Sequence, residues 1–95
     1  MFLHESSYKI PGGKFVKIKL EISLGKIVDV KILGDFFLHP EETLQKIEDS
    51  LVGSTAVETT IENAISRILT ESDATLIGAT ARDIAKTIIM AWNVT

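Results

Sequence analysis

Apolar and polar residues alternate in the first third of the chain. The segment from Phe15 to Leu24 has an apolar residue at every even position, and alternation resumes from Ile27 to Leu33. A period of two is typical of a strand with one buried and one solvated face. Leu24 and Gly25 mark a compact turn, so the two segments are predicted to pair as an antiparallel hairpin. The residues predicted to face inward are Val16, Ile18, Leu20, Ile22, Leu24, Val28, Val30 and Ile32.

Three later segments have the wider apolar spacing of amphipathic helices. The first helix is predicted to begin at Pro40, because the missing N–H of proline has no partner in a first turn, and to end at Gly53. Thr55 and Glu58 have capping-box spacing before the second helix, and Thr80 begins a weaker version of that motif before the third. The apolar stripes are Leu44, Ile47 and Leu51; then Val57, Ile61, Ala64, Ile65, Ile68 and Leu69; then Ala81, Ile84, Ala85, Ile88 and Trp92.

The order of these segments predicts the fold class. Residues 2–10 form a further extended arm, which Pro11, Gly12 and Gly13 interrupt. Strands followed by helices indicate an α+β fold, with about three helices packed on one face of an antiparallel sheet of about three strands. The 95 residues contain no linker or repeat. We therefore expect a single domain over residues 1–95.

Composition narrows the classes of function. The net charge of −3 gives no basic surface for nucleic acid. The absence of cysteine excludes disulfides, thiolate catalysis and thiolate metal sites. No apolar run approaches the roughly 20 residues of a membrane span, and the first residues lack the features of a secretion signal. We therefore expect a cytoplasmic protein that binds neither nucleic acid nor membrane.

The chain offers few groups for catalysis. His4 lies near the terminus, and His39 directly precedes the predicted helix, where a capping role and a catalytic role are both open. Glu41 and Glu42 would lie in the first helical turn, where carboxylates favour the helix dipole. No His spacing suits the roughly four ligands of a zinc site. The sequence therefore predicts no catalytic and no metal-ligating residue.

The segment Gly34-Asp35-Phe36-Phe37 has the clearest potential for binding. Adjacent residues of an extended segment face opposite sides, so Phe36 and Phe37 cannot both point into one core. The outer ring is then covered by the chain's own helices or anchors a partner. Asp35 either bonds backbone N–H groups of a turn or contacts that partner.

The segment Gly12-Gly13-Lys14 is only loosely similar to a phosphate-binding loop, because it leads into a strand and lacks the required spacing. It is either a tight bend or a bend that also lends the charge of Lys14 to a shared site. No reactive constellation converges in the sequence, which favours a partner-binding module over an enzyme.

These pieces together resemble a known family. Several pieces occur in the order found in the C-terminal accessory domain of lipoate–protein ligases. They are Tyr8-Lys9-x-Pro11-Gly12-Gly13-Lys14, the alternating strand, Gly34-Asp35-Phe36-Phe37 followed by Pro40-Glu41-Glu42, and Leu51-x-Gly53. The later half resembles that domain in outline only. The positions expected to contact the partner or the substrate site are Lys9, Gly12, Gly13, Lys14, Gly34, Asp35, Phe36 and Phe37.

The resemblance implies a fold similar to small iron–sulfur scaffolds, although a scaffold function would need the cysteines that are absent here. It also implies that this chain is the accessory subunit of a two-subunit lipoate–protein ligase and is not catalytic on its own. Such a subunit binds the catalytic subunit and is needed for ATP-dependent activation of lipoate to lipoyl-adenylate, before transfer to lysines of lipoyl-domain acceptor proteins. Lipoate, ATP and Mg²⁺ would bind at the partner's site, and no cofactor would bind this chain alone. The alternative is an unrelated interaction module, homodimeric through a sheet edge or the aromatic pair.

Overall fold

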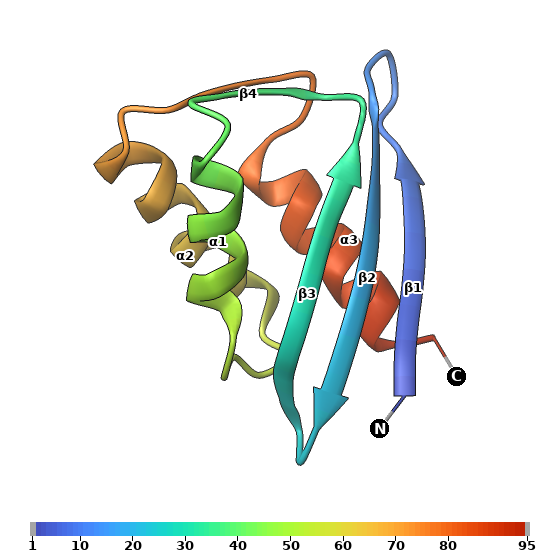
Figure 1. Cartoon of the computed structure of the whole chain (residues 1–95). Coiled ribbons are helices and arrows are strands. Elements are labelled where there is room, and N and C mark those ends of the chain that lie inside the picture. The colour runs from blue at the N-terminus through green and yellow to red at the C-terminus, as the bar shows by residue number, and fades with distance from the viewer. Residues whose placement is uncertain (1, 95) are drawn as a thin grey trace.

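The computed structural model describes residues 2–94, and its helices pack on one face of a three-stranded antiparallel sheet (Figure 1). The strand order is β1-β2-β3, and a separate two-stranded sheet pairs β4 with β5. The α+β class is confirmed, with three helices among the described residues. The elements are β1 (Phe2–Lys9), β2 (Phe15–Ser23), β3 (Lys26–Gly34), β4 (Phe37–His39), α1 (Thr43–Leu51), α2 (Glu58–Glu71), β5 (Thr75–Ile77) and α3 (Ala81–Trp92).

The predicted hairpin between β2 and β3 is present, with two corrections to its inward face. Leu24 and Gly25 form the two-residue turn with φ values of 54° and 74°, the left-handed geometry that matches strand twist. Leu24 is therefore 98% exposed and not in the core. A β-bulge between Glu21 and Ile22 shifts the register. As a result Ile27 is buried, whereas Val28, predicted to face inward, is exposed.

The core lies between the sheet and the helices. α3 packs on β1 and β2, α1 packs on β3, and α2 contacts both other helices. Burial of these side chains supplies most of the driving force for folding. The fully buried large side chains are Val16, Ile18, Leu20, Ile27, Val30, Ile32, Ile47, Leu51, Ile61, Ile65, Ile84 and Ile88.

Two predicted helix starts are wrong. α1 begins at Thr43 rather than Pro40, because β4 keeps the chain extended as far as His39 and residues 40–42 then turn. His39 is accordingly an exposed residue of β4 and not a helix cap. α2 begins at Glu58, but its N-cap is Val57 and no side chain caps it.

The predicted capping box of α3 is present. The Asp83 N–H donates to Thr80 Oγ1 at 3.1 Å, and the Thr80 N–H donates to Asp83 Oδ2 at 3.0 Å. The segment before α3, where the sequence pattern predicts no strand, forms β5, in which Ile77 lies opposite Phe37 of β4. None of the helices described over residues 2–94 is long and apolar enough to cross a membrane.

Candidate functional site

Segments far apart in sequence meet at the end of the sheet where β3 leads into β4 (Figure 1). We call this site the glycine corner; it consists of Gly12, Gly13, Lys14, Gly34, Asp35, Phe36 and Gly78. The loop between β1 and β2 is closed by the Ile10 N–H donating to the Lys14 carbonyl oxygen at 2.9 Å. A Cβ on Gly78 would lie 2.5 Å from Cγ of Lys14 and 3.6 Å from Cα of Phe36. The side chain of Lys14 therefore crosses Gly78 in close contact, in a position that only glycine permits.

Two of the predicted site residues hold this corner together. The Phe15 N–H donates to Asp35 Oδ1 at 2.8 Å, across 20 residues of sequence. Lys9 Nζ donates to the Gly13 carbonyl oxygen at 3.2 Å. Asp35 thus bonds a backbone N–H, as one of its two interpretations predicts, although the N–H belongs to β2 and not to its own turn. Both side chains are exposed, so a contact with a partner stays a prediction for each.

The two phenylalanines point to opposite sides, as the period of an extended segment predicts. Phe36 is half-buried and packs against the hydrophobic core, whereas Phe37 is 55% exposed. The ring of Phe37 stacks on His39, with centroids 6.4 Å apart and an interplanar angle of 7°. Phe37 is therefore the ring that is free to contact another molecule.

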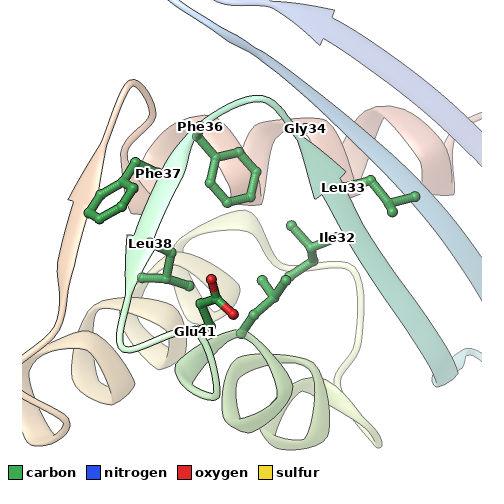
Figure 2. A pocket seen from close by; sticks show the side chains of 8 residues that line it. Ile32, Leu33, Gly34, Phe36, Phe37, Leu38 and Glu41 are labelled. Atoms are coloured by element: carbon green, nitrogen blue, oxygen red, sulfur yellow. The ribbon is translucent and has the colours of Figure 1, made fainter.

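A groove opens between the end of β3, β4 and the start of α1 (Figure 2). Its volume is about 490 Å³. Glu41 is the one charged residue among those that line the groove, and the other lining residues are apolar. An apolar surface of this kind suits apolar side chains, with a cation placed near the carboxylate. The lining residues are Ile32, Leu33, Gly34, Phe36, Phe37, Leu38, Glu41 and Leu44.

Two exposed apolar side chains of the groove and a third that is paired with one of them form what we call the apolar rim. Leu33 and Phe37 line the groove and are 44% and 55% exposed. Ile77 lies opposite Phe37 in the β4–β5 pair and is 58% exposed. Exposed apolar residues around a groove are typical of a surface that a protein partner covers.

Part of this site is not predictable from the sequence pattern. The sequence pattern places Ile77 and Gly78 in no helix or strand. It predicts that Glu41 lies in a helical turn, whereas Glu41 lines the groove. The short apolar run ending in Gly78 is the only sequence signal for β5, and nothing in it indicates pairing with β4. Over residues 2–94, no three His, Asp or Glu side chains are grouped to hold a metal ion.

The fold and the site define a class, namely a small α+β domain that carries a groove with an apolar rim. Comparison with known proteins identifies the family within that class. A model described as the bacterial lipoate protein ligase C-terminus matches residues 1–88, and the chain belongs to this family.

Two relatives come from Thermoplasma acidophilum. "Lipoate-protein ligase A subunit 2" is 33% identical over 52 residues, which are 55% of this chain and 54% of that protein. The aligned stretch thus spans about half of each. A solved structure from a study of a bi-partite lipoate protein ligase and its E2 lipoyl domain superposes with a TM-score of 0.72 and 24% identity. The superposition covers 99% of this chain and 98% of the chain in the solved structure, and it shows that the two have the same fold.

Proposed function

We propose that this chain is the accessory subunit of a two-subunit lipoate–protein ligase. In this proposal it binds the catalytic subunit and is needed for ATP-dependent activation of lipoate to lipoyl-adenylate, before the lipoyl group passes to lipoyl-domain lysines. Family membership supports the kind of reaction. The observation that carries the docking role is the groove with its apolar rim of Leu33, Phe37 and Ile77.

The two subunits have different roles in this proposal. Lipoate, ATP and Mg²⁺ are held by the catalytic subunit, and this chain supplies a shaped surface. A docked surface orders loops over a reactive adenylate and excludes water, which protects the adenylate from hydrolysis. Lys14, exposed at the glycine corner, is the cation of this site that contacts the partner's site. Gly12, whose Cβ would have no atom of this chain within 4 Å, lets the backbone come close to the partner.

An ATP–pyrophosphate exchange assay tests this proposal. The chain alone with lipoate, ATP and Mg²⁺ is expected to give no exchange. The catalytic subunit alone is expected to give little, and the mixture is expected to give full exchange that saturates at equimolar ratio. Full exchange by the catalytic subunit without this chain contradicts the proposal, and so does exchange by this chain alone.

A further inference from the structure

The two edges of the main sheet differ in how their backbone groups are satisfied. At β3, the Ile32 N–H donates to Glu48 Oε2 of α1 at 2.8 Å. Farther along this edge, the Ile27 N–H donates to the Ser54 carbonyl oxygen at 2.9 Å, and the Gly53 N–H donates to the Ile27 carbonyl oxygen at 2.8 Å. The β3 edge is therefore closed by α1 and the loop that follows it, which prevents pairing with another strand.

The β1 edge is open over the described residues. β1 pairs only with β2, over Phe2 to Lys9, without a bulge. Ile32 directs its N–H away from β2, so alternation along the ladder makes Ile18 and Ser6 a hydrogen-bonded pair. The residues of β1 that direct their N–H and C=O groups outward are then Leu3, Glu5, Ser7 and Lys9.

α3 holds this open strand in place from the face of the sheet that the helices cover. Ser6 Oγ donates to the Thr87 carbonyl oxygen at 2.7 Å, and His4 Nδ1 lies 3.2 Å from the Ala91 carbonyl oxygen. Lys86 Nζ lies 4.5 Å from the centroid of the Tyr8 ring. The edge is therefore a preorganised template, and pairing with it requires little further ordering of this chain.

The side chains along the open edge identify its occupant. Glu5 and Lys9 are both exposed on the sheet face away from the helices, with Ser7 midway between them. Two antiparallel copies of β1 related by a two-fold axis at Ser7 place each Glu5 opposite Lys9 of the second copy. Opposite charges in directly opposed cross-strand positions attract, and the symmetry produces this pair twice.

We propose that this chain self-associates through β1 and forms a continuous six-stranded sheet across two copies. Lys9 exchanges its exposed contact with Gly13 for the contact with Glu5 of the second copy. The groove lies beside β3, at the opposite edge of the sheet (Figures 1 and 2). A partner in the groove and a second copy at β1 can therefore be bound together, and the self-association does not depend on the proposed function.

Sedimentation velocity on the purified chain, without any catalytic subunit, tests this inference. The chain is expected to show a monomer–dimer equilibrium at micromolar to submillimolar concentration. Glu5→Lys and Lys9→Glu are each expected to weaken it about 10-fold, because both symmetric pairs become repulsive. The double variant is expected to restore the wild-type constant, and Glu21→Lys, on the central strand, is the control expected to leave it unchanged.

Ser7→Pro supplies a second, backbone test. The Ser7 N–H points out of the sheet, so proline removes the central hydrogen bonds between the copies and leaves the β1–β2 ladder intact. Dimerisation is expected to be lost while the circular dichroism spectrum is retained. A wild-type chain that stays monomeric up to about 0.5 mM overturns the inference. A dimer that both Ser7→Pro and Glu5→Lys leave unchanged also overturns it, because another surface then holds the copies.

Discussion

Gly34, the last residue of β3, lies against Phe15 of β2 and against Phe36. A Cβ at this position would meet the carbonyl oxygen of Phe15 and would lie 2.8 Å from Cδ2 of Phe36. A side chain here therefore pushes Phe36 out of its packed position and weakens the bond between Phe15 and Asp35. The glycine is what allows the groove wall to form.

Gly34→Ala is expected to lower the free energy of unfolding by about 3 kcal/mol, as overpacking does at a tight site. Gly12→Ala is the matched control. Gly12 also has a positive φ, of 70°, but a Cβ added there would have no atom within 4 Å. The free energy of unfolding is therefore expected to fall by only about 1 kcal/mol. Urea denaturation of both variants checks this, and equal losses would contradict the packing argument.

At the residue scale, the sequence predicts that Phe36 and Phe37 separate, because an extended segment alternates sides. It does not predict which ring is exposed. That choice depends on the pairing of β4 with β5, and the residues that pair, such as Phe37 and Ile77, are far apart in the chain.

Among the elements, the helix caps show how much a motif alone predicts. Thr55 and Thr80 both begin a capping-box spacing, yet only Thr80 makes the two reciprocal bonds with Asp83. Thr80→Ala is expected to lower the free energy of unfolding by about 1 kcal/mol. Thr55→Ala is expected to change it by less than about 0.5 kcal/mol. Thermal unfolding followed by circular dichroism checks the contrast, and a larger loss at Thr55 would contradict it.

The contact between α1 and β3 depends on a buried carboxylate. Glu48 is 8% exposed and accepts the Ile32 N–H. Glu48→Ala leaves this N–H without a partner, so the free energy of unfolding is expected to fall by about 1.5–3 kcal/mol. Glu48→Gln keeps an acceptor oxygen and is expected to lose less. A Gln variant as unstable as the Ala variant in urea denaturation would show that this hydrogen bond is not the cause.

Elements with long, regular patterns are the ones that the sequence predicts. The β2–β3 hairpin, α3 and α2 after its start lie where alternation and helical spacing place them. β4 and β5 have three residues each, which is too short for a period to show. The bulge at Glu21 and Ile22 has no signal, because one extra residue changes the register and not the composition.

For the molecule as a whole, the order of elements is enough to predict the α+β class. The groove is not predictable in this way, because it exists only where the ends of β3, β4 and α1 come together. The family pattern marks the glycine corner, but the surface beside it depends on tertiary packing. Binding of the catalytic subunit at the groove and its rim is therefore the central claim to test.

Isothermal titration calorimetry of this chain with the catalytic subunit is the most direct test of that claim. Phe37→Ala is expected to weaken binding by about 2 kcal/mol, or about 30-fold, as loss of an aromatic anchor does. Leu24→Ala is the control, since Leu24 is 98% exposed but lies at the opposite end of β3. Wild-type affinity in a folded Phe37→Ala variant, or an equal loss in Leu24→Ala, would contradict the account.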